Sequence, residues 1–483
     1  MIESAETPAP GAAPLASPAP AAGGMPLSPG VQLARERGIA RLEQEAAQRA
    51  AVRARRFDSI AVHGIYGMAA ALENNGSIIE PAYLSPAQHF ADSDAMEATT
   101  SLLAPGWVYS RIANPTLHYL EETLALLEGY GFDGETSACA TGSGMAAISM
   151  ATMPFLAVDD DPRPMNIVAT ARCYGGTFQL FSERFARERG VEVRWVRDPL
   201  DLGEWAAKID GRTRFVFGEM PSNPGLSVFD IAAVAELAHA AGVPLLVDST
   251  VATPALLRPL RHGADIVVHS LSKAIGGSGM AIAGAIVSRR DIPSRVGPDE
   301  LRADFATHVK LLPFRDHGPA LSPLSALMLL NDLRTLRLRV DAWSRSAARV
   351  ARFLAGHPSV REVAYPGLAG AEGHELAARY LWLVDGDEEG NPVNRFGHLL
   401  GFRVAGGHEA ARRVFDSLEL IWRATDLGKA KSVATIPMIS THQQQGESGR
   451  ELAAIPSDLI RLSVGGEHPD DLVADLDRAL AHA

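Results

Sequence analysis

Short apolar runs alternate with amphipathic segments between Asp133 and about Ser288, and this alternation limits the possible folds of the 483-residue chain. Residues 214–218, 244–248 and 266–269 have the pattern of strands, and residues 231–241 have the periodicity of a helix. Strands that alternate with helices predict a parallel sheet covered by helices on both faces. We therefore expect an α/β protein.

Composition and periodicity predict how the chain is organised into regions. Residues 1–30 are rich in Ala, Pro, Gly and Ser, a composition typical of a disordered tail. We expect residues 31–110 to form a helical arm and interface segment, and residues 111–320 to form a large domain. A helix-rich stretch followed by further strands and helices in residues 321–483 predicts a smaller C-terminal α/β domain.

Charge and cysteine content exclude several classes of protein. The formal net charge of −12 repels nucleic acid and anionic membranes, and every apolar run is shorter than the roughly 18 residues of a membrane span. Glu3 and Glu6 occupy the place of the basic start of an export signal. The two cysteines, Cys139 and Cys173, form no disulfide framework, although a single bridge between them stays open. We expect a cytoplasmic protein without a metal site.

Two polar side chains follow neighbouring predicted strands. Asp248 ends one apolar run, and Lys273 follows the next run and precedes the flexible segment 276–279. A lone carboxylate at such a place is more often a helix cap, and a lone lysine is usually a surface charge. Together at the carboxyl edge of a sheet, they are the groups that pyridoxal 5'-phosphate (PLP) requires. The lysine forms a Schiff base, and the carboxylate keeps the pyridine nitrogen protonated.

A phosphate also needs donors, and the small residues 140–147 open an amphipathic helix whose free N–H groups favour an anion. Ser270 and Ser272 offer further hydroxyl donors. The stretch from Gly142 also fits G-x-G-x-x-A, so on this segment alone a dinucleotide site is an alternative. The downstream lysine and carboxylate favour PLP.

Seven stretches, in order, resemble the Cys/Met-metabolism PLP enzymes, which include cystathionine γ-synthase, methionine γ-lyase and O-acetylhomoserine sulfhydrylase. The resemblance covers roughly residues 57–481 and implies a PLP-dependent transferase of fold type I, with a mainly parallel seven-stranded sheet in the large domain. The matching stretches are 109–116, 143–148, 174–178, 219–224, 248–250, 263–273 and 461–467.

The resemblance also implies roles for individual residues. Tyr109 and Arg111 match residues that reach across a dimer interface to the PLP phosphate of the neighbouring subunit, so a homodimer or homotetramer with shared active sites is expected. Tyr174 matches the aromatic residue that stacks on the cofactor ring and takes part in catalysis with Lys273 and Asp248. The remaining cofactor-binding positions are Gly144, Met145, Asn223, Thr250, Ser270 and Ser272.

For the substrate, the resemblance places Arg461 on the α-carboxylate, a task that suits the guanidinium fork. Ser432 is a weaker match to a hydroxyl residue beside that carboxylate, and an ordinary loop hydroxyl is an equal alternative. Without the resemblance, Tyr174 would be read as a core aromatic, Asn223 as a turn residue and Arg461 as a solvent-facing strand position.

Several departures from the family pattern bear on substrate choice. Residues 274–279 lack the aromatic residue and the histidine that commonly follow the lysine, which predicts a different pocket wall. Gly176 replaces the cysteine associated with methionine γ-lyases, and Met438 is part of an Ile-Pro-Met run that replaces His-Pro-Ala. Residues 441–445, Thr-His-Gln-Gln-Gln, are more similar to the sulfhydrylase branch.

These observations predict γ-elimination or γ-replacement on an O- or S-substituted homoserine, most similar to O-acetylhomoserine sulfhydrylase. The freed amine of Lys273 removes the Cα proton of the substrate. One alternative is a γ- or β-lyase that acts on methionine, cystathionine or a canavanine-type substrate. Alternatives from other classes are a non-catalytic PLP-binding homologue and a nicotinamide-dependent dehydrogenase.

Overall fold

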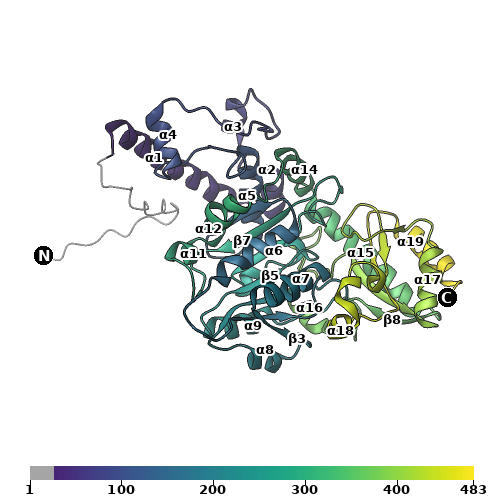
Figure 1. Ribbon diagram of the computed structural model, residues 1–483. Helices are drawn as coiled ribbons and strands as arrows, with labels where there is room; N and C mark the ends of the chain where they lie inside the picture. The colour runs from purple at the N-terminus through teal and green to yellow at the C-terminus, as the bar shows by residue number, and fades with distance from the viewer. Residues whose placement is uncertain (1–26) are drawn as a thin grey trace.

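The computed structural model describes residues 27–483 (Figure 1). The predicted tail at residues 1–30 lies outside this part except for its last four residues, and of these Pro29 and Gly30 already belong to helix α1. No helix in the described part is long and apolar enough to cross a membrane.

A seven-stranded sheet forms the larger of two sheets, with the strand order β1-β7-β6-β5-β4-β2-β3. Strands β6, β5, β4, β2 and β3 pair in parallel, whereas β7 runs antiparallel to both of its neighbours. The predicted mainly parallel sheet is therefore confirmed. Its strands are β1 (Thr136–Thr141), β2 (Asn166–Thr170), β3 (Glu192–Val196), β4 (Thr213–Glu219), β5 (Leu245–Asp248), β6 (Ile266–His269) and β7 (Gly284–Arg289).

Both faces of this sheet are buried, as β4 illustrates. Phe215 and Phe217 pack into one apolar cluster with helices α6 and α12, whereas Val216 packs on the opposite face with α5, α9 and α14 (Pro323–Leu333). A strand buried on both faces is apolar throughout, which explains its continuous apolar sequence. The helices of this part are α5 (Pro115–Glu128), α6 (Gly144–Thr152), η1 (Met153–Leu156), α7 (Gly175–Gln179), η2 (Leu180–Arg187), α8 (Leu202–Lys208), α9 (Ile231–Ala240), α10 (Thr253–Leu256), η3 (Pro259–His262), α11 (Asp299–Ala303), α12 (Phe305–Val309), η4 (Lys310–Phe314) and α13 (Arg315–His317).

A five-stranded sheet, ordered β10-β11-β12-β9-β8, organises the C-terminal part of the chain. It is antiparallel except for the pair β10 and β11, and its apolar side packs against α15, α17 and α19 (Figure 1). The elements are α14 (Pro323–Leu333), α15 (Leu336–Gly356), β8 (Val360–Ala364), α16 (His374–Tyr380), β9 (Leu399–Val404), α17 (Gly407–Asp416), β10 (Trp422–Arg423), β11 (Val433–Thr435), η5 (Pro437–Ile439), η6 (Gln443–Gln445), α18 (Gly446–Leu452), β12 (Leu459–Ser463) and α19 (Pro469–Leu480).

The predicted N-terminal arm is a long helix that is attached to the large sheet. Arg49 donates to the carboxylate of Glu122 at 2.8 Å and to the carbonyl oxygen of Thr136 at 2.6 Å, and Arg53 pairs with Glu135 at 2.6 Å. These basic residues therefore hold the arm against the start of β1. The arm and the segment after it comprise α1 (Pro29–Arg53), α2 (Phe57–His63), α3 (Met68–Glu73) and α4 (Ser93–Thr100).

Candidate active site

The carboxyl ends of β5 and β6 bring Asp248 and Lys273 to one edge of the large sheet. The two strands pair in parallel with Asp248 opposite Val268, so both chains leave the sheet at the same edge. The hydroxyl oxygen of Thr250 accepts the amide of Ser270 at 2.8 Å and joins the two loops. The predicted juxtaposition of the carboxylate and the lysine-bearing segment follows from this register.

Asp248 is buried and keeps one oxygen free. Its Oδ1 accepts the amide of Thr250 at 3.0 Å, and Oδ2 has no donor among the described residues. Burial raises the pKa of the Asp248 carboxyl, while the Thr250 hydrogen bonds and the nearby His269 act in the opposite direction. Behind this carboxylate, His269 and Glu128 form a fully buried pair with 2.6 Å between Nε2 and Oε1. The free oxygen is suited to an N–H donor such as a protonated pyridine.

A second buried carboxylate, Glu219, positions two predicted site residues. Its two oxygens accept the amides of Tyr174 and Asn223, each at 2.7 Å. Glu219 lies opposite Asp248 in the sheet, and burial followed by the charge of Asp248 raises the pKa of Glu219 well above its usual value. Tyr174 precedes α7, is partly exposed and has its ring edge-on to His442 with 6.4 Å between centroids.

The start of α6 forms a tight cradle between the two loops. Ser143 caps the helix by accepting the amide of Ala146 at 3.1 Å, which leaves the amides of Gly144 and Met145 at the free end. A Cβ at Gly144 would lie 2.6 Å from the Cβ of Ser270, so only glycine fits. The N–H groups at this helix end suit a phosphate.

The two serines of the predicted phosphate site differ in their surroundings. Ser272 donates to the carbonyl of Ala283 at 3.1 Å and accepts its amide at 2.9 Å, so its hydroxyl already has protein partners. The Ser270 hydroxyl makes no hydrogen bond within the described chain. Ser270 is therefore the more available of the two donors.

Arg461 is fully buried in β12, yet part of its guanidinium has no partner. Nη1 donates to Oδ1 of Asn223 at 3.0 Å and Nη2 donates to the carbonyl oxygen of Asp426 at 2.7 Å, while Nε lacks an acceptor within the described residues. Burial lowers the pKa of Arg461 to about 10, so the side chain is still charged at neutral pH. A buried cation with an unused donor is suited to a carboxylate ligand.

The structure places Ser432, Tyr109 and Arg111 differently from the other predicted residues. The buried Ser432 hydroxyl donates to Glu467 at 2.8 Å and accepts the amide of Gly465 at 2.8 Å, so a substrate contact would compete with these bonds. Tyr109 and Arg111 are exposed, and the Arg111 guanidinium lies 5.5 Å from the Tyr109 ring. Neither bonds to another predicted site residue within the described part of the protomer.

Comparisons with known proteins identify the family of this chain. The family model described as "Cys/Met metabolism PLP-dependent enzyme" matches residues 61–481. The chain belongs to this family. It is thus a PLP-dependent enzyme, and the resemblance found in the sequence is confirmed.

Relatives with curated names are similar over most of their length. The homocysteine synthase of Schizosaccharomyces pombe is 36% identical over 425 residues, which cover 83% of this chain and 93% of the relative. The O-succinylhomoserine sulfhydrylase of Pseudomonas aeruginosa is 38% identical over 378 residues, 78% of this chain and 84% of the relative.

A solved structure supports the fold and the cofactor of the family. The crystal structure of a putative O-acetylhomoserine (thiol)-lyase from Campylobacter jejuni is 34% identical, with a TM-score of 0.78 over 88% of this chain and 100% of that protein. That structure contains N'-pyridoxyl-lysine-5'-monophosphate, which is PLP joined to a lysine. The predicted fold type and cofactor are thus confirmed for this enzyme.

The residues of this PLP-dependent enzyme fit the cofactor. The free oxygen of Asp248 suits the pyridine nitrogen, the α6 cradle with Ser270 suits the phosphate, and the amine of Lys273 would suit the aldehyde carbon. The sequence pattern includes Glu219 only as part of a matching stretch, and it does not single out Asp426. Oδ1 of Asp426 lies 2.5 Å from Nζ of Lys273. A carboxylate 153 positions away along the chain has no local signal that could have shown this contact.

Two buried histidines near Arg461 are expected to make the folded enzyme less stable in acid. Burial, and next the charge of Arg461, lowers the pKa of both His398 and His442 to about 4. The unfolded chain binds these protons near pH 6.5, so the free energy of unfolding falls as the pH decreases from about 6.5 towards 4. At pH 5 each histidine accounts for about 2 kcal/mol of the loss.

Urea unfolding of His398→Phe at about pH 7.5 and at about pH 5 measures this contribution. We expect the difference in unfolding free energy between the two pH values to shrink by about 2 kcal/mol, because phenylalanine keeps the edge-on packing against Trp343 and takes up no proton. The exposed His482 provides the control, and His482→Gln should leave the difference unchanged. A His398→Phe variant with the wild-type acid dependence would contradict the assignment.

Proposed function

We propose that the enzyme catalyses γ-replacement on an O-acylated homoserine, with sulfide or a small thiol as the nucleophile. The observation that carries this proposal is the buried Arg461 with its unused Nε, because it provides a site for the α-carboxylate of an amino acid near Lys273. The homocysteine synthase and sulfhydrylase names of the relatives support the acyl-homoserine substrate.

Each residue of the site has a separate role in this reaction. Arg461, positioned by Asn223, binds the α-carboxylate of the substrate, and the neutral amine of Lys273 accepts the proton from Cα. Bound PLP supplies an electron sink for the negative charge at Cα. Asp248 would hold the pyridine nitrogen of the cofactor, and Asn223, Thr250 and Tyr174 would contribute to holding its ring.

The products of two parallel incubations test the reaction type. In replacement, the acyl group leaves as its carboxylate and sulfide bonds to Cγ to give homocysteine. In elimination, water instead yields 2-oxobutanoate and ammonia. We expect O-acetylhomoserine with sulfide to give homocysteine, and little keto acid to form without sulfide. Fast keto acid release in both incubations would instead support the lyase alternative, and O-succinylhomoserine in a matched pair determines the preferred acyl group.

We also propose that the enzyme is a homodimer or homotetramer with shared active sites. Several large apolar side chains are highly exposed in the protomer, which is typical of an interface. They are Met68, Leu72, Ile78, Leu84, Met280 and Ile282.

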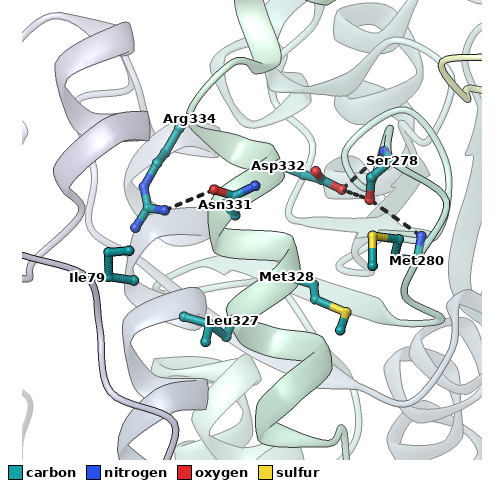
Figure 2. Close-up of a pocket in the computed structure, with 8 residues that line it drawn as sticks. All are labelled: Ile79, Ser278, Met280, Leu327, Met328, Asn331, Asp332 and Arg334. Carbon is teal, nitrogen blue, oxygen red and sulfur yellow. Dashed lines mark hydrogen bonds between the residues drawn. The ribbon is translucent and has the colours of Figure 1, made fainter.

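A pocket of about 350 Å³ between α14 and residues 278–280 supports the same proposal (Figure 2). Ile79, Met280, Leu327 and Met328 give it an apolar lining, next to the hydrogen bond of 2.6 Å from the Ser278 hydroxyl to Asp332. Because residues 276–279 begin three positions after Lys273, a partner seated here would lie close to the active site.

Subunit complementation tests whether Arg111 acts in a neighbouring active site. Arg111→Ala and Lys273→Ala are each expected to be nearly inactive alone, whereas co-expressed subunits should recover roughly a quarter of the wild-type activity, because half of the dimers are mixed and each contains one intact site. Tyr109 belongs to the same exposed segment, and Tyr109→Ala paired with Lys273→Ala should behave in the same way. Activity that stays absent in purified mixed dimers would contradict shared sites.

We also propose that the enzyme is located in the cytoplasm. Cys139 and Cys173 are both free and buried, which suits a reducing compartment.

A further inference from the structure

The carboxylate of Asp426 lies against the amine of Lys273. Oδ1 of Asp426 is 2.5 Å from Nζ of Lys273, and the same oxygen accepts the amide of Leu427 at 2.9 Å. The side chains of Asp426 and Lys273 are 41% and 28% exposed, so the pair faces the open site rather than the core. A carboxylate in contact with an amine favours the protonated form of that amine.

The loop that carries Asp426 is held in place from three sides. Nη2 of Arg461 donates to the carbonyl oxygen of Asp426 at 2.7 Å. Gly428 has a φ of +67°, and a Cβ there would lie 2.5 Å from the amide nitrogen of Ala274, so the loop packs directly on the backbone after Lys273. The ammonium of Lys429 donates to the carbonyl oxygens of Ser272 and Gly276. These contacts fix the carboxylate beside the lysine.

Other charged groups around the pair are mainly cationic. Lys429 lies in the same loop with its Nζ 3.9 Å from Oδ2 of Asp426, and Arg461 approaches from β12 with Tyr174 near its guanidinium. Burial raises the pKa of Asp426, but the hydrogen bond and charge of Lys273, the amide of Leu427 and the charge of Lys429 together outweigh burial, so the net pKa is lowered and the carboxylate is ionised at neutral pH. The carboxylate of Asp426 is thus the negative charge in contact with Nζ of Lys273, among neighbours that are mainly cationic.

We propose that Asp426 sets the pH range of the reaction by holding a proton on Nζ of Lys273. This inference rests on the proposed function, in which Nζ accepts the Cα proton. The proton moves from Cα to Nζ, Asp426 stays ionised throughout, and the step needs no further reactant. With the cofactor attached to Lys273, the same contact would stabilise a proton on this nitrogen.

The visible absorption of the cofactor-loaded enzyme, followed against pH without substrate, tests the proposal. In Asp426→Asn the midpoint of the spectral titration should move to lower pH by about one unit, roughly a tenfold loss of proton affinity, because the attraction of the carboxylate is gone. Asp426→Glu should restore most of the wild-type midpoint. The difference in titration midpoint between wild type and Asp426→Asn should become smaller in high salt, because the pair is partly exposed and salt screens its attraction.

Two further variants separate this effect from general changes in charge or folding. Lys429→Met removes a cation and should move the midpoint to higher pH, opposite to Asp426→Asn. Asp332→Asn removes a carboxylate that bonds to Ser278 rather than to Lys273, and its midpoint should equal that of wild type.

Borohydride reduction followed by peptide mass spectrometry shows whether the cofactor is attached to Lys273. Attachment to another residue would overturn the proposed function. Attachment to Lys273 with an unchanged midpoint in Asp426→Asn would overturn the role of Asp426 alone, whatever the midpoint of Lys429→Met, and would make the contact a structural ion pair.

Discussion

Replacing Lys273 with alanine should abolish the visible absorption band of the bound cofactor and lower turnover by about three orders of magnitude or more. The amine both attaches the cofactor and accepts the Cα proton, so its loss removes two functions at once. The fold should persist, because the side chain is partly exposed and pairs with Asp426 at the surface of the site rather than in a core. Absorption spectra and steady-state rates of the purified variant measure both effects.

Lys431 offers a matched control for the loss of one lysine. It is exposed in the same C-terminal loop region as Asp426 and lies over the Trp422 ring at 4.4 Å. Lys431→Ala should therefore keep the absorption band and nearly all of the turnover. A Lys273→Ala protein that keeps the band would show that the cofactor is attached elsewhere.

Local sequence patterns were sufficient to predict the strands that carry the site. The runs ending at Gly218, Asp248 and His269 are strands β4, β5 and β6, because each is apolar enough to be buried on both faces of a sheet. Because ligand-binding residues gather at the carboxyl ends of parallel strands, the sequence alone predicts Asp248 next to the segment of Lys273. The family resemblance supplied the remaining positions.

Contacts between distant segments were not predictable in the same way. Strand β7 is inserted antiparallel between β1 and β6, and no local pattern determines that order. The contact of Asp426 with Lys273 depends on how the C-terminal sheet packs against the large sheet. The hydroxyl of Ser432 bonds to Glu467, so its predicted role beside the substrate stays a prediction that the geometry does not favour. These features arise from tertiary packing rather than from propensity or periodicity.

Replacing Arg461 with lysine should lower kcat/KM for the amino acid substrate by about a hundredfold or more, while the absorption band of the cofactor is retained. The guanidinium donates hydrogen bonds to Asn223 and to the carbonyl oxygen of Asp426, and its Nε is left to donate to a substrate. A lysine ammonium is a compact charge on a flexible stem and cannot reproduce this fork. Steady-state kinetics with O-acetylhomoserine and sulfide measure the loss.

An analogue of the substrate without the α-carboxylate separates recognition from general damage to the site. Arg403 on β9 provides the matched control, because it pairs with Asp458 at 2.7 Å and Glu362 at 2.8 Å and has no contact with Asn223 or Asp426. Arg403→Lys should keep wild-type kinetics. If Arg461 binds the α-carboxylate, the poor rate with the analogue should be the same in wild type and Arg461→Lys, because the contact that the variant weakens is already missing. An equal loss with both substrates would mean that Arg461 maintains the loop of Asp426 instead.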